Sequence, residues 1–155
     1  MRAKVFPKGK QYQSKKYAFL YHQKLLIEQT FSYLKCDIKN NVLVCIGWLQ
    51  PQDCKDQYKV KIEYVVGYEP KTTILKPFIL PSKHIHMYKD HSVCLHYPPD
   101  MRWNEKIKIC EYTIPWVSEW IIFYEIYQIT GKWEGRESPV HIRESDKNIG
   151  VDIND

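Results

Sequence analysis

The sequence predicts an α+β fold in which helices cover one face of an antiparallel sheet. An amphipathic segment near the start is followed by short runs of alternating apolar and polar residues, and a long apolar segment comes later. Strands that follow one another between turns pair as an antiparallel meander. The chain has 155 residues, of which 44% are hydrophobic and 14% aromatic. It is therefore long enough to bury a core without a metal or disulfide.

The first element expected is a helix from Ser14 to about Leu34. The Ser14 hydroxyl can cap its first turn, and Leu20, Ile27, Phe31 and Leu34 fall on one stripe of the helix surface. A basic arm, residues 1–13, precedes it.

About four strands are expected after this helix. "NNVLVCIGWLQ" (40–50) follows a turn, and "QYKVKIEYVVGYE" (57–69) alternates as a half-buried antiparallel strand does. "TTILKPFI" (72–79) is cut short by its proline, and "SVCLHY" (92–97) is a short extended segment.

A second helix is expected in "IPWVSEWIIFYEIYQITG" (114–131), with Pro115 near its start and Gly131 just past its end. It is apolar nearly all round, which predicts that core or a partner covers most of it. Nothing in the sequence indicates a second domain. We therefore expect a single domain over 14–141, followed by a flexible polar tail, 142–155.

The charge and the cysteine content of the chain indicate where the protein is located and which classes of partner it has. The net charge is +5, and the first sixteen residues hold six Lys or Arg and no acid. No apolar segment follows these charges as in a secretory signal, and no apolar run is long enough to cross a bilayer. The five cysteines are odd in number and form no CxxC pair, which favours free thiols in a reducing cytoplasm.

The segment "KHIHMYKDHSVCLHYP" (83–98) gathers four histidines around Cys94. Zinc is one interpretation, because His84 with His86 and Cys94 with His96 form two close pairs, but no CxxC or HExxH occurs. The basic, tyrosine-rich start of the chain also permits a nucleic-acid-binding domain, although no phosphate loop or RNA-binding signature accompanies it. A third interpretation makes Cys94 a nucleophile, and a fourth makes it an ordinary buried cysteine.

The order of residues around Cys94 resembles the active-site segment of ubiquitin-conjugating enzymes. In that family a His-Pro-Asn tripeptide precedes a catalytic Cys-Leu, and a tryptophan and a helix follow. Here His84-Ile85-His86 lies ten to eight residues before Cys94-Leu95, and Trp103 follows the loop "HYPPD". Ile85 and His86 replace the family's proline and asparagine. With a single strong C-terminal helix, the pattern looks like the small bacterial conjugating enzymes of type II (short) CBASS antiphage operons.

The resemblance implies a ubiquitin-conjugating-enzyme-like fold and a cytoplasmic thioester (acyl) transferase with no metal and no cofactor. Cys94 would carry the C-terminus of a partner, a cGAS-like nucleotidyltransferase, and a separate activating enzyme is possible because the chain has no Gly-rich adenylate loop. His86 would stabilise the oxyanion, His96 would help deprotonate the nucleophile, and His84 would fix the loop by a backbone hydrogen bond. The same resemblance allows a catalytically silent interaction module. No membrane partner is expected, and nucleic acid is disfavoured.

Overall fold

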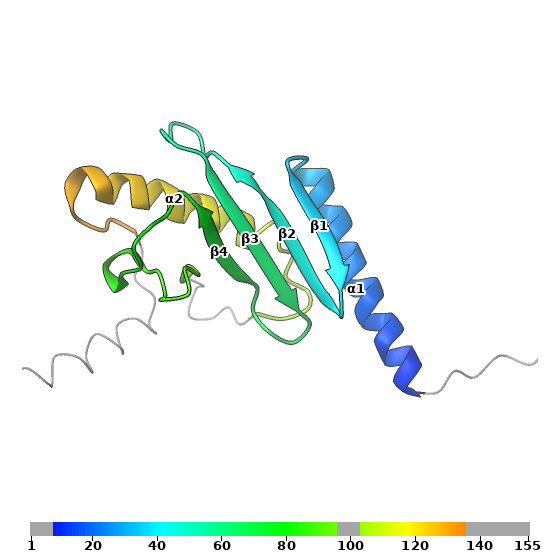
Figure 1. The fold of residues 1–155 in the computed structure, drawn as a ribbon. Coiled ribbons are helices and arrows are strands. Elements are labelled where there is room, and N and C mark those ends of the chain that lie inside the picture. Colours follow the sequence, from blue (N-terminus) through cyan, green and yellow to red (C-terminus); the bar gives the residue numbers. More distant parts are fainter. Residues whose placement is uncertain (1–7, 96–102, 136–155) are drawn as a thin grey trace, which may run out of the picture.

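The computed structural model describes residues 8–95 and 103–135, with side chains from residue 15 onward (Figure 1). A four-stranded sheet lies between two long helices in the chain order, with a short 3-10 helix after the last strand. The elements are α1 (Lys8–Thr30), β1 (Leu34–Lys39), β2 (Val42–Leu49), β3 (Tyr58–Val65), β4 (Lys71–Lys76), η1 (Lys83–Ile85) and α2 (Thr113–Thr130).

The four strands form one antiparallel meander in the order β1-β2-β3-β4. β2, β3 and β4 are the strands predicted at 40–50, 57–69 and 72–79, whereas β1 was not predicted and the segment at 92–97 contributes only isolated bridges at Ser92 and Val93. Side chains alternate between its two faces, as the period-two pattern of the strands requires. On β2, Leu43, Cys45 and Leu49 are buried, whereas Ile46 and Trp48 on the opposite face are exposed. One face therefore holds the core and the other faces solvent.

The helices supply the second layer, and the expected α+β fold is confirmed. Figure 1 shows α1 alongside β1 and α2 running behind the other end of the sheet. The side chains that join the layers are fully buried: Leu20 and Ile27 of α1, Tyr58 and Ile62 of β3, and Ile114 and Ile121 of α2.

The expected bounds of the first helix were wrong at both ends. The helix begins at Lys8, inside the segment predicted to be an arm, and ends at Thr30. Leu34 is buried because it opens β1, not because it lies on the helical stripe. Leu34 and Cys36 are buried and the residues between and after them are exposed, which is the alternation of a strand.

The cysteines also differ from the prediction of five free thiols. Cys36 and Cys45 are joined by a disulfide. They are direct partners in the register of β1 and β2, with their Cα atoms 4.1 Å apart, so the hairpin brings together two cysteines that are nine residues apart in the sequence. Cys54, Cys94 and Cys110 form no disulfide.

The second helix agrees with the prediction in its bounds. Gly131 has a φ of 72° and its N–H donates to the carbonyl of Tyr127 at 2.7 Å, the left-handed cap that favours glycine. Its covering is less complete than expected, because Trp120 and Ile121 are buried but Ile129 near its end is 86% exposed. Among the described residues, no helix is long and apolar enough to span a membrane.

Candidate active site

The segment from Ser82 to Leu95 carries Cys94, and its second half runs beside the edge strand β4. It begins with η1, whose first turn is capped by Ser82: the His84 N–H donates to the Ser82 Oγ at 3.1 Å. The 3-10 helix ends at His86, which takes a left-handed conformation with φ 55°. The chain can therefore reverse and return past its own start.

Backbone hydrogen bonds then fix Cys94 from both sides. The Cys94 N–H donates to the His86 carbonyl at 2.8 Å, which ties it to the end of η1. The Val93 N–H donates to the Thr72 carbonyl at 2.9 Å, which ties the preceding residue to β4. The extended segment predicted around Cys94 is thus confirmed at Ser92 and Val93, which form isolated bridges with β4 and with the strand-like residue Met87.

A carboxylate holds the turn that precedes Cys94. Asp90 accepts hydrogen bonds from the N–H of Ser92 at 3.0 Å and from its hydroxyl, and its other oxygen lies 2.7 Å from the Lys71 Nζ. The hydrogen bond from Lys71, followed by those from Ser92, holds the pKa of Asp90 well below its usual range. Asp90 therefore stays ionised and joins the turn to the start of β4. This role was missed in the sequence, although an Asp two residues before a Ser is a known turn pattern.

A cavity of about 230 Å³ opens beside Cys94. Its walls come from the turn between β3 and β4 and from the Cys94 segment, so residues distant in the sequence share it. They are Glu69, Pro70, Lys71, Tyr88, Ser92, Val93, Cys94 and Leu95. Cys94 is partly exposed and lines this cavity, as a residue that must meet a second molecule has to do.

The histidines occupy different surroundings. His86 is only 6% exposed, and its ring centroid lies 5.2 Å from that of Trp133. The Trp120 indole N–H donates to the Ile85 carbonyl at 2.8 Å, so α2 also fixes this loop. His84 is exposed, and the hydrogen bond that fixes the loop there is made by its backbone N–H.

His91 and His96 are the other two histidines close to Cys94 in the sequence. His91, to which no role was assigned, packs against Phe78 with ring centroids 5.4 Å apart. His96 lies outside the described residues. The structure thus brings His86 and Cys94 together through their backbones. Within residues 8–95 and 103–135, no three His, Cys, Asp or Glu side chains gather as metal ligands would.

Cys54 and Cys110 lie in different surroundings from Cys94. Cys110 is buried in the core, only 7% exposed, so a second molecule cannot reach it. Burial, together with the charge and hydrogen bond of Glu125, raises the pKa of Cys54 to about 11. At neutral pH Cys54 is therefore a protonated thiol, whereas Cys94 lines the cavity beside the predicted active-site segment.

In a comparison with known families, residues 23–141 match the family described as type II CBASS E2 protein. This range covers well over half of the chain and includes all four strands, Cys94 and α2. None of the curated proteins compared with the chain matches it. The chain belongs to the type II CBASS E2 family, and the suspected relationship is confirmed.

Proposed function

We propose that this E2-like protein of CBASS antiviral defence is a cytoplasmic thioester transferase with Cys94 as its nucleophile. The observation that carries the proposal is the setting of Cys94: a partly exposed thiol beside a cavity, held by backbone hydrogen bonds to His86 and, through Val93, to β4. Family membership supports a conjugating role for this site.

The proposed reaction has two steps. The Cys94 thiolate attacks the activated C-terminal carbonyl of a partner protein; the C–S bond forms and the activating group leaves. An amine then attacks the same carbonyl carbon, the C–N bond forms, and the C–S bond breaks to return the thiol. Sulfur suits this cycle because it is both a good nucleophile and a good leaving group. The partner proposed is a cGAS-like nucleotidyltransferase encoded alongside, its C-terminus activated by a separate enzyme.

The histidines are assigned supporting roles in the same proposal. His86 is the proposed donor to the oxyanion that forms when the amine attacks; its backbone carbonyl accepts the Cys94 N–H, so the two residues are neighbours in the loop. His84 is proposed to fix the loop, which agrees with its backbone hydrogen bond to Ser82. His96 is proposed to help deprotonate the incoming nucleophile.

The test is to trap the acyl intermediate in cells that express the protein with its operon neighbours. Cys94→Ser should form an oxyester that resists thiols and is cleaved by base, because an alkoxide is a poorer leaving group than a thiolate. Cys94→Ala should form no adduct, whereas Cys54→Ala and Cys110→Ala should keep the thiol-labile adduct. A thiol-labile adduct in the Cys94→Ala protein would contradict the assignment and leave the chain as a binding module.

A further inference from the structure

Trp133 packs on the imidazole of His86 from outside the segment that carries Cys94. The two ring centroids lie 5.2 Å apart, and the ring planes are inclined by 41°. His86 is only 6% exposed, and Trp133 is half-buried. Because the two residues are far apart in the sequence, only the fold brings them together. The contact joins the chain after α2 to the end of η1.

The end of α2 directs the chain back toward this loop. Gly131 caps the helix in a left-handed conformation, and Trp133 follows directly after the turn. Phe123 and Trp120 of α2 lie against the Trp133 ring, with centroids 5.9 and 6.1 Å away. Gly135 packs so closely that a Cβ on it would lie 2.8 Å from the Trp133 Nε1. The indole is therefore fixed on several sides by α2 and by its own segment.

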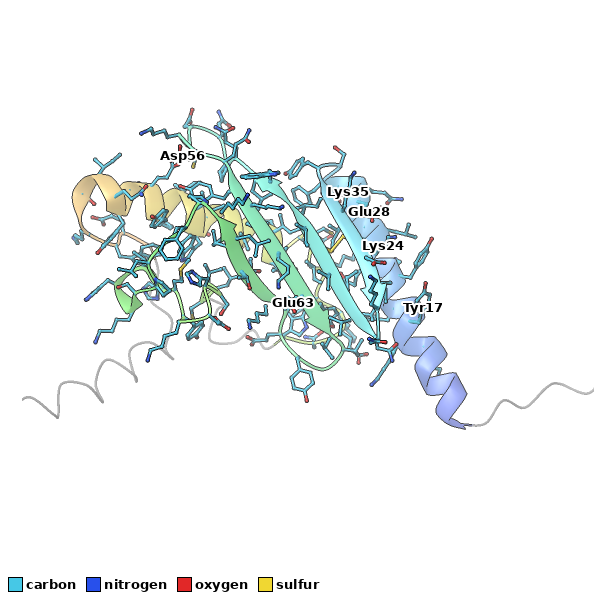
Figure 2. All side chains as sticks on the ribbon, viewed as in Figure 1. Tyr17, Lys24, Glu28, Lys35, Asp56 and Glu63 are labelled. Carbon is cyan, nitrogen blue, oxygen red and sulfur yellow. A yellow bond between two sulfur atoms is a disulfide. The ribbon has the colours of Figure 1, made fainter. Side chains whose placement is uncertain are left out.

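α2 is anchored at two points, so the wall behind the histidine is fixed relative to the loop. The Trp120 indole N–H donates to the Ile85 carbonyl at 2.8 Å, which holds the residue just before the histidine. Glu125 accepts the backbone N–H of Asp56 at 3.0 Å, which ties α2 to the β2–β3 connection (Figure 2 labels Asp56). Packing on this helix can therefore set a side-chain orientation in the loop.

The backbone hydrogen bonds of His86 place the residue but do not orient its side chain. Its carbonyl accepts the Cys94 N–H, and its own N–H donates to the Lys83 carbonyl at 3.2 Å. Rotation about the side-chain bonds would still turn the imidazole nitrogens away from Cys94. A donor stabilises an oxyanion well only when it already points to where the charge develops. The indole of Trp133 restricts that rotation.

We propose that Trp133 is a positioning residue, whose indole holds the His86 imidazole in the orientation from which it donates to the oxyanion. The inference rests on the proposed thioester function and on the role proposed there for His86. Trp133 takes no part in the bond changes and transfers no proton. It removes a side-chain freedom that His86 would otherwise have to lose on the way to the transition state.

The kinetic test is a double-mutant cycle on the conjugate isolated from coexpression with the operon neighbours. Discharge by excess butylamine is followed by intact mass in a single turnover. Trp133→Leu should slow discharge about 10- to 100-fold, because a misplaced donor loses much of its effect. Trp133→Phe keeps an aromatic ring against the imidazole and should restore most of the rate. In the His86→Ala protein, Trp133→Leu should cause no further slowing, since the group that it positions is gone.

Trp116→Leu is the matched control. Trp116 packs on Tyr112 at the other end of α2, with ring centroids 5.7 Å apart. This change also removes an indole that packs along the helix, but it leaves Trp133 in place. Discharge should therefore occur at the wild-type rate.

A second readout needs no partner protein. The proton NMR signal of the His86 ring, identified by its loss in His86→Ala, should be displaced by the ring current of Trp133. Trp133→Leu should shift this signal toward the position of a solvent-exposed histidine, and Trp133→Phe, the milder change, should shift it part of the way. Trp116→Leu should not shift it.

The outcomes separate the inference from the function on which it rests. If Trp133→Leu slows discharge equally with and without the His86 side chain, or leaves the His86 signal unshifted, the positioning role is overturned and the thioester function stands. If His86→Ala discharges at the wild-type rate, the donor role fails and the inference fails with it. If the wild type forms no conjugate, the thioester function fails as well.

Discussion

Replacing Glu125 by alanine should destabilise the fold through a loop far from it in the sequence. Glu125 on α2 accepts hydrogen bonds from the backbone N–H groups of Lys55 and Asp56, at 2.8 and 3.0 Å, and from the Tyr58 hydroxyl at 3.1 Å. This carboxylate joins the β2–β3 connection to α2. The loop N–H groups are exposed, so water can replace their partner, but the Tyr58 side chain is fully buried.

The expected loss of stability in Glu125→Ala follows from this contrast between the buried hydroxyl and the exposed N–H groups. Leaving a buried hydroxyl such as that of Tyr58 without its acceptor costs about 1–3 kcal/mol, and each exposed N–H adds about 0.5 kcal/mol. The total is about 2–4 kcal/mol, which corresponds to a fall of about 6–12 °C in Tm for a chain of this size. Thermal unfolding followed by circular dichroism measures it. Glu119→Ala, at an exposed position of the same helix, should change the free energy of unfolding by less than about 0.5 kcal/mol.

Two further readouts separate this account from a general loss of helix stability. Burial acts to raise the pKa of Glu125, but the hydrogen bonds from Asp56, Lys55, Tyr58 and Cys54 outweigh it and lower the pKa. The stabilisation is thus present above the unfolded pKa of about 4.3 and is lost as the pH falls through the lower folded value. The difference in the free energy of unfolding between the wild type and Glu125→Ala should therefore become smaller in acid. Cys54 should also alkylate faster in the variant, because the charge that raises its pKa is gone. Equal melting temperatures for Glu125→Ala and Glu119→Ala would refute the reasoning.

Three other predictions test the site and the sheet. His86→Ala should slow transfer from the thioester to an amine by about 100- to 1000-fold in a single-turnover assay. His84→Ala removes an exposed side chain and should leave this rate unchanged. Equal rates in the two variants would mean that another group is the oxyanion donor. Gly47→Ala should lower the free energy of unfolding by about 1–3 kcal/mol in urea, because the added Cβ would meet the Tyr33 carbonyl oxygen and lie 2.7 Å from a Leu34 methyl group. Purified protein should hold no stoichiometric zinc by elemental analysis and should keep its melting temperature in chelator; metal loss with unfolding would restore the zinc interpretation.

Strands β2 to β4 and the second helix could be predicted because local signals agree there with the tertiary structure. The alternation of apolar and polar residues is sufficient to predict β3, and the proline and glycine at its two ends are sufficient to predict α2. β1 could not be separated from the first helix, since Leu34 satisfies a helical stripe and a strand alternation equally well. Only the pairing of Leu34 with Gly47 of β2 shows that Leu34 belongs to a strand and not to the helix.

The sequence predicted the segment that carries Cys94 and His86 but not the residues from other elements that lie beside it. Cys94 and His86 lie in one segment whose spacing carries the signal, and the structure places their backbones within hydrogen-bonding distance. Glu69 lies in the turn before β4 and Lys71 opens β4, so their place beside Cys94 depends on how β4 and the Cys94 segment pair. The disulfide between Cys36 and Cys45 likewise depends on register, which composition does not encode.

The most direct test of the central claim is the intact mass of the wild-type protein purified with its operon neighbours, followed by peptide mapping. The account predicts a conjugate whose mass is the sum of this chain and its partner less one water. Exchange with an added thiol should release this chain with its Cys94 thiol restored and the partner as a thioester of the added thiol, and the mapped linkage should join Cys94 to the partner's C-terminal carbonyl. Absence of any thiol-labile conjugate beside the genuine neighbours, or a linkage mapped to another cysteine, would contradict it.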